Sequence, residues 1–177
     1  MKETRLSIAV AVIIVVALLG CSQTYQMNQS LTEPLVAPET CRIGVIEDAL
    51  PDSQPPEQRP TAANLDQFRL DLATAIDEKH SLRMVDSLQP AAYEVRTKLL
   101  AFEKVDGFFV SLFPFLVNRA RLTAYVELVH LESDQVVCAG EFNRSERTFI
   151  RPTAETFRGI ARDFAGEVSK QNRRLLR

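Results

Sequence analysis

Three cysteines, two histidines and scattered carboxylates are the side chains of this 177-residue chain that could do chemistry. Neither His80 nor His130 lies at ligand spacing from a cysteine, so no metal site is predicted. No serine lies in a GxSxG turn, and the HExxH, P-loop and GxGxxG patterns are absent. The carboxylate pair Glu47 and Asp48 precedes a proline-rich loop and is an ordinary pair. The sequence therefore predicts no catalytic residue, no metal and no cofactor.

Cys21 is the cysteine whose surroundings indicate a reaction. The first five residues carry Lys2 and Arg5, and the apolar run LSIAVAVIIVVALL follows and ends in LLGC. A basic start, a short apolar stretch and a small residue at the cut are typical of an export signal. A transmembrane helix is the alternative, but about 14 residues at about 1.5 Å each reach about 21 Å, short of a hydrocarbon core of roughly 30 Å.

The LLGC sequence resembles the lipobox of bacterial lipoproteins. The resemblance implies a thioether-linked diacylglycerol on Cys21, cleavage before Cys21 and acylation of the new amino terminus. Ser22 follows the cysteine, and the sorting pattern of such lipoproteins favours the outer membrane when aspartate is absent at that position. The expected location is therefore the periplasmic face of the outer membrane, with lipidated Cys21 as the membrane contact.

Cys41 and Cys138 remain once Cys21 carries lipid. In an oxidising periplasm two remaining cysteines often pair. They can equally stay as two separate buried thiols that behave as small apolar side chains. Each shares an alternating face with apolar residues of an expected strand, so both could point into the core. A Cys41–Cys138 disulfide is therefore a candidate beside the separate thiols.

Length and charge bound the rest of the chain. The net charge of −2 gives no electrostatic footprint for nucleic acid, and no nucleic-acid partner is predicted. Residues 1–20 form the expected lipoprotein signal peptide. Residues 21–40 are polar, contain two prolines and show no sustained period, which predicts a flexible tether. Residues 41–177 are long enough for a single periplasmic domain that folds without a metal or a disulfide.

Hydrophobic periodicity predicts the elements of that domain. Strands are expected at 41–47, 82–87, 92–104, 119–131 and 136–147, and helices from Thr61 to about His80 and from Pro152 through Val168. The strand–helix–strand start requires a parallel, right-handed crossover, whereas the later, closely joined strands should be antiparallel. The predicted fold class is α/β, with a mixed four- to five-stranded sheet and two helices packed on one face.

The segment from Val105 to Val117, VDGFFVSLFPFLV, is rich in phenylalanine and contains Pro114, so it is not one regular strand. Three interpretations stay open. The segment folds back over the core, or it is an apolar loop that contacts a partner protein, or it enters the bilayer interface as a second anchor. Under the last two, the partner or membrane contact residues are Phe108, Phe109, Phe113 and Phe115.

The IGV run from Ile43 and the phrase LTAYVEL from Leu122, together with the order of elements, carry a second resemblance. Over about 130 residues from Cys41 the pattern is similar to the curli-secretion-channel lipoprotein and to the amino-terminal domain of the Tol-system translocation protein. This resemblance implies an assembly or accessory role rather than chemistry.

The predicted function is that of a membrane-anchored periplasmic lipoprotein, a non-catalytic accessory, assembly or docking domain for an envelope complex. Its expected partners are the membrane, through Cys21, and an envelope protein. Two alternatives stay open. One is a lipoprotein that binds lipid or a small apolar ligand, and the other is an envelope enzyme.

Overall fold

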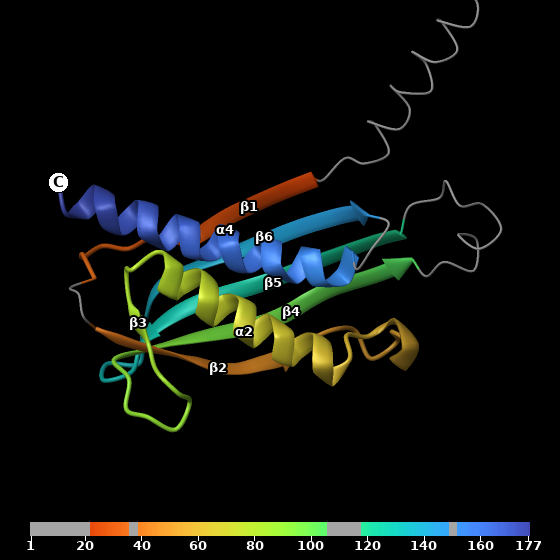
Figure 1. Cartoon of the computed structure of the whole chain (residues 1–177), viewed down its shortest axis with the longest axis horizontal. Coiled ribbons are helices and arrows are strands. Elements are labelled where there is room, and N and C mark those ends of the chain that lie inside the picture. Colours follow the sequence, from red (N-terminus) through yellow and green to blue (C-terminus); the bar gives the residue numbers. More distant parts are fainter. Residues whose placement is uncertain (1–21, 36–38, 106–117, 149–151) are drawn as a thin grey trace, which may run out of the picture.

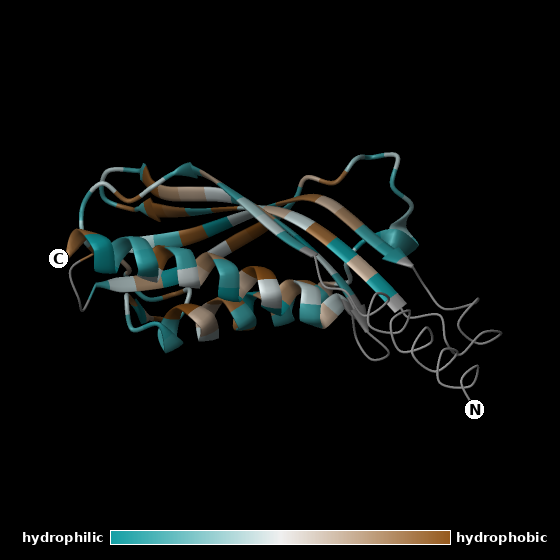
Figure 2. Cartoon of the chain, turned by 90° about the horizontal axis from the view of Figure 1, so that it is seen from above, coloured by the Kyte–Doolittle hydropathy of each residue, from teal (hydrophilic) through white to brown (hydrophobic). Residues whose placement is uncertain are grey.

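A six-stranded sheet carries two long helices on one of its faces (Figures 1 and 2). This computed structural model describes residues 22–35, 39–105, 118–148 and 152–177. The strand order across the sheet is β1-β6-β5-β4-β2-β3. The elements in chain order are β1 (Ser22–Gln29), β2 (Thr40–Asp48), the short helix η1 (Pro56–Gln58), α2 (Ala62–Glu78), β3 (Arg83–Met84), β4 (Tyr93–Val105), β5 (Asn118–His130), β6 (Gln135–Thr148) and α4 (Pro152–Leu175).

The predicted α/β class with a mixed sheet is confirmed. β2 is parallel to both β3 and β4, as a strand–helix–strand start requires. β4, β5, β6 and β1 are joined by antiparallel pairings. The predicted number of strands is wrong, because the described chain has six strands rather than four to five. The additional strand is β1.

The structure of residues 22–35 corrects, for that part, the prediction of a flexible tether over residues 21–40. Ser22–Gln29 pairs with β6 along the sheet edge, and Tyr25 stacks on Phe142 with ring centroids 5.7 Å apart. The segment that follows is also held in place, because Leu31 and Leu35 are buried in the core. The sequence signal was weak because an edge strand needs apolar side chains on only one face.

The N-terminal segment is fastened to α4 by side-chain amides. The Leu31 N–H donates to Gln171 Oε1 at 2.7 Å, and the Leu35 N–H donates to Asn172 Oδ1 at 2.8 Å. Asn172 Nδ2 in turn donates to the carbonyl of Leu35 at 3.4 Å. These bonds satisfy backbone groups that would otherwise be buried without partners.

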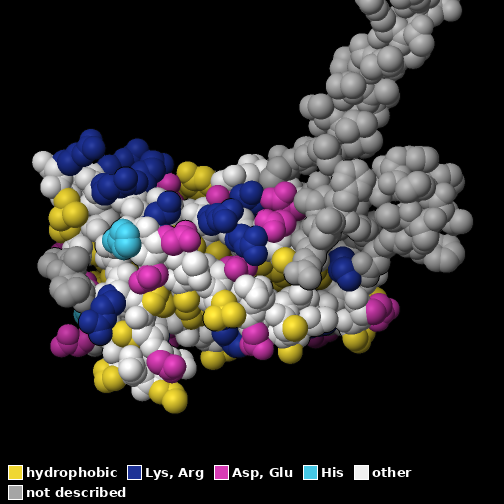
Figure 3. All heavy atoms as spheres, viewed as in Figure 1, with side chains coloured by type: hydrophobic (Ala, Val, Ile, Leu, Met, Phe, Trp, Pro, Cys, Tyr) yellow, Lys and Arg dark blue, Asp and Glu magenta, His cyan; other side chains and the backbone are white. Residues whose placement is uncertain are grey.

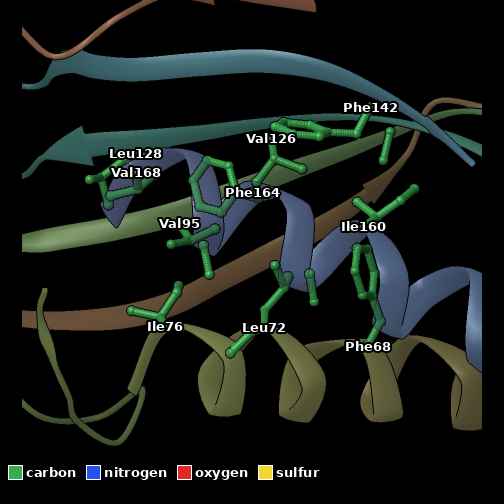
Figure 4. Packing of buried hydrophobic residues seen from close by; sticks show 14 of the residues in the cluster. Phe68, Leu72, Ile76, Val95, Val126, Leu128, Phe142, Ile160, Phe164 and Val168 are labelled. Carbon is green, nitrogen blue, oxygen red and sulfur yellow. The ribbon is translucent and has the colours of Figure 1, made fainter. Parts of the chain in front are cut away.

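The core lies between the sheet and the two helices (Figure 4). α2 begins at a capping box in which Thr61 and Asn64 bond each other's backbone N–H, and Phe68 and Leu72 face the sheet. The apolar stripe expected on α4 is buried, and its largest members are Phe157, Ile160 and Phe164. Phe157 lies against Phe68, with ring centroids 4.9 Å apart, so the two helices share one core.

Candidate functional site

The residues predicted to make contacts fall into two groups. Cys21 and the phenylalanines of the 105–117 segment, Phe108, Phe109, Phe113 and Phe115, lie outside the described residues. Their roles stay predictions. Cys41 and Cys138 are both described.

The structure contradicts the Cys41–Cys138 disulfide. Cys41 lies on β2 and Cys138 on β6, with β4 and β5 between them. Three interstrand spacings of about 4.8 Å place them about 14 Å apart across the sheet, whereas a disulfide needs Cα atoms within about 7 Å. Both thiols are free and buried, and burial raises the pKa of each to about 12. They are therefore inert apolar side chains of the core.

The open face of the sheet, opposite the helices, holds a hollow. It has a volume of about 810 Å³ and lies over β2 and β4. Arg69 of α2 and Ser87 of the loop after β3 also line it, so the hollow extends past the β2 edge. The charged residues that line it are Arg42, Glu47, Arg69, Glu94, Arg96, Lys98 and Glu127.

Cross-strand ion pairs organise this surface. Glu94 accepts from Arg42 Nε and from Arg96 Nε, both at 2.8 Å. Lys98 Nζ lies 3.3 Å from Glu47 Oε2. Gly44 leaves room for the Glu94 side chain between the two arginines, because a Cβ at position 44 would lie 2.9 Å from that side chain. Cations and anions alternate, so the hollow suits a polar or peptide ligand better than a single anion or cation.

The electrostatics of Glu94 argue against a proton-transfer role. Burial raises the pKa of Glu94, but the hydrogen bonds from Arg96 and Arg42 outweigh burial and hold the pKa below its ordinary value. A carboxylate that stays ionised and has both oxygens bonded is neither a general acid nor a basic group near neutral pH. Glu94 is best understood as the anion that orders two arginines.

The described residues that adjoin Cys21 and the 105–117 segment lie at one end of the sheet. Ser22 pairs with Ser145 of β6, which pairs with Arg121 of β5. Arg121 pairs with Glu103 of β4 on the same rung. The start of β1, the end of β4 and the start of β5 therefore lie at one end of the sheet, at the right in Figure 1. Four neighbouring strands at about 4.8 Å spacing put β1 and β4 about 14 Å apart there.

This end also carries basic side chains. The last described residues of β4 and the first of β5 include Lys104, Arg119 and Arg121, against the single acid Glu103. Arg119 Nε donates to Ser145 Oγ at 3.2 Å, and this bond holds the Arg119 side chain on the open face of the sheet. Basic groups at this end are suited to anionic lipid headgroups.

A second basic cluster lies at the far end of the molecule. Figure 3 shows Lys and Arg side chains gathered over the carboxyl end of α4, where Lys170, Arg173, Arg174 and Arg177 lie. α4 begins beside the end of β6, so its last turn lies away from Ser22. Cations in the last turn of a helix complement its dipole, which gives this cluster a structural role.

The described residues offer no metal site, no membrane-spanning helix and no lipid-sized apolar cavity among the pockets beside the core. They hold no group of three or more His, Cys, Asp or Glu side chains placed to bind a metal ion. Of the described helices, none is long and apolar enough to cross a bilayer. The apolar cavity between Ile76, Leu82 and Phe164 measures about 10 Å³, which is too small for a lipid chain.

Comparison with known proteins shows a shared fold. No family model matches the chain, and no curated protein matches it. Among solved structures, protein XCC0632 from Xanthomonas campestris has a TM-score of 0.55 at 10% identity, over 82% of this chain and 93% of that one. The PelC dodecamer from Paraburkholderia phytofirmans has a TM-score of 0.54 at 11% identity, over 81% of this chain and 94% of that one. At such identity the likeness concerns the fold alone.

Sequence reasoning did not find the hollow. Its central contact joins Arg42 to Glu94, 52 positions apart, and only the strand register brings them together. One signal was present, since Glu94, Arg96 and Lys98 alternate with apolar residues along the expected strand at 92–104. That alternation predicted a polar face, but not which residues on neighbouring strands would meet it.

Proposed function

We propose that this chain is a lipid-anchored periplasmic domain of the outer membrane that docks or assembles an envelope complex and catalyses no reaction. The observation that carries this proposal is that the described residues beside Cys21 and beside the phenylalanine-rich segment lie at one end of the sheet. Cys21 immediately precedes β1, and the phenylalanine-rich segment joins the end of β4 to the start of β5.

The chemistry of the described residues supports a binding role. Glu94, which lines the hollow, accepts hydrogen bonds from two arginines, and the two buried cysteines have a pKa raised to about 12. Neither arrangement supplies a nucleophile with an oriented base. A hollow lined by alternating charges is instead a surface for polar protein contacts. The small size of the apolar cavity beside Phe164 makes lipid carriage the weaker alternative.

Cys21→Ala is expected to abolish lipidation and cleavage. The natural chain should begin at Cys21, with a mass that includes a diacylglycerol and an acyl group, whereas the variant should keep residues 1–20. Intact-mass measurement of the protein from isolated membranes checks this. An unchanged mass in the variant would contradict lipid attachment, and recovery of the natural chain in the inner membrane would overturn the outer-membrane location alone.

Phe109→Trp tests the membrane contact at this end. The chain has no tryptophan, so the variant carries a single fluorophore. In vesicles that contain brominated anionic lipid, we expect blue-shifted emission that is strongly quenched, because an interfacial ring lies beside the bromine atoms. Fluorescence of the full chain reconstituted in vesicles is the measurement.

Leu88→Trp is the matched control. Leu88 is exposed and follows β3, at the opposite end of the sheet from Ser22, so its emission should stay unquenched. Blue-shifted but unquenched emission from Phe109→Trp would place the ring in the core. Emission that matches the control would show a solvated ring, and either result would refute membrane contact.

A further inference from the structure

The β2 side of the sheet ends in a strand that is unpaired over most of its length. β3 pairs with β2 only at Thr40 and Cys41. From Arg42 to Asp48, β2 has β4 on one side and no strand of the described chain on the other. An edge strand presents free backbone N–H and C=O groups, which can pair with an added strand.

One exposed apolar side chain lies on this edge, and two more adjoin lining residues in the sequence. Val45 lines the hollow and is 74% exposed. Leu88 is 94% exposed and Leu70 is 61% exposed, and each directly follows a residue that lines the hollow. Single exposed apolar residues are ordinary on a protein surface, but Val45 stands on the unpaired strand itself and so offers an apolar contact to an added strand.

The charges along β2 specify what the added strand must carry. Arg42 and Glu47 both line the hollow, and β4 meets them with Glu94 and Lys98. Glu47 follows Arg42 by five positions in β2, whereas their partners Glu94 and Lys98 are four positions apart in β4. The register shift between Ile43 and Ile46 accounts for the difference. A strand added on the side of β2 away from β4 would also lie beside Arg42 and Glu47. The complementary pattern is therefore an acidic residue followed, four positions later, by a basic one.

We propose that the free edge of β2, residues 42–48, accepts an extended strand of a partner protein with an acidic residue opposite Arg42 and a basic residue opposite Glu47. The strand adds in parallel, as β3 and β4 do, and its side chains on the open face enter the hollow. β1 of a second copy does not fit this description, because its sequence, SQTYQMNQ, carries no charge.

This inference names the class of partner for the proposed docking function and rests on that function for its biological meaning. The test of strand addition needs no membrane, so the strand-addition proposal and the proposed membrane-anchored docking function can fail separately. The probe is a fluorescein-labelled peptide with the sequence YEVRTKL, which is that of residues 93–99 and already matches β2 on its other side. The matched control is the peptide YEVRTEL, in which the basic residue becomes acidic.

Binding is measured by fluorescence anisotropy against the full chain in detergent. We expect YEVRTKL to bind about fivefold more tightly than YEVRTEL, because the control places two acids opposite each other. Glu47→Lys should reverse the order, so that YEVRTEL binds more tightly. Glu47 is exposed and its contact with Lys98 lies at the surface, so the variant should fold. Hydrogen exchange of residues 43–47 should slow when YEVRTKL is bound.

Three results would overturn the proposal. The first is the absence of binding at millimolar peptide, and the second is equal affinity for the two peptides in both proteins. The third is protection of β1 in place of β2. Sedimentation of the chain alone is the remaining check, since self-association that protects residues 43–47 without peptide would make a second copy the occupant of this edge.

Discussion

Replacing Arg144 with methionine is expected to lower the free energy of unfolding by about 3 kcal/mol at pH 7. Arg144 Nε lies 2.7 Å from Glu146 Oε1, and Arg144 Nη1 lies 3.0 Å from Asp163 Oδ2. All three side chains are at most 19% exposed. Removing the cation leaves two carboxylates in a largely buried site, and breaking a buried pair in this way costs about 3–5 kcal/mol.

The loss should grow with pH. Burial raises the pKa of Asp163, and the charge and hydrogen bond of Arg144 lower it only in part, so the pKa stays above its ordinary 3.8. A carboxyl whose pKa is raised by folding contributes stability that is full below pH 3.8 and is lost as pH rises through the folded-state pKa. Without Arg144 this pKa rises further, so the deficit should be smallest near pH 4 and largest at pH 7.

Urea unfolding between pH 4 and pH 7 checks this prediction. Arg121→Met, which removes an exposed arginine of β5, is the matched control and should change little. Gly159→Ala tests the same network from α4, since a Cβ there would lie 1.9 Å from Arg144 Nε. A deficit for Arg144→Met that is under 1 kcal/mol, or that is the same at every pH, would contradict this account of the network.

Replacing Gln171 and Asn172 together with leucine is expected to release the segment that follows β1. In the double variant the Leu31 N–H and the N–H and C=O of Leu35 lose their hydrogen-bond partners. Each buried unsatisfied group costs about 1–3 kcal/mol. Opening residues 30–35 relieves that cost. Their amide hydrogens should exchange about 100-fold faster, which corresponds to about 3 kcal/mol, while the amides of α4 stay protected.

Hydrogen exchange followed by mass spectrometry measures this release. Gln67→Leu is the control, because Gln67 is an exposed amide on α2 that bonds only locally to Asp71. Unchanged exchange at residues 30–35 in the double variant would mean that apolar burial of Leu31 and Leu35 alone holds the segment. Equal acceleration across α4 would mean global rather than local opening.

The helices and the antiparallel strands could be predicted because their burial pattern is local. The stripe of Phe157, Ile160 and Phe164 repeats with the helical period, and all three are buried as expected. Alternation between 92 and 104 likewise predicted β4 to within a residue. Such patterns depend only on which face of one element meets the core.

β1 and the hollow could not be predicted because both depend on distant partners. β1 has few apolar residues, and Tyr25 and Met27 gain their packing from β6 and α4. For the same reason the sequence could not decide between a Cys41–Cys138 disulfide and two separate buried thiols, since alternation placed both cysteines on buried faces but did not give the strand order between them. Strand order is a property of the whole sheet.

The placement of β1 has a consequence for the order in which the chain folds. Leu31 bonds to Gln171, 140 positions later, and Gln23 meets Arg144, 121 positions later. If the chain is exported as proposed, the amino-terminal segment crosses first and its partners arrive last. Contacts of such long sequence separation form late in folding. If Cys21 is processed as proposed, the residues after it stay open to the processing enzymes until nearly the whole chain has crossed, and completion of the sheet then seals them against α4.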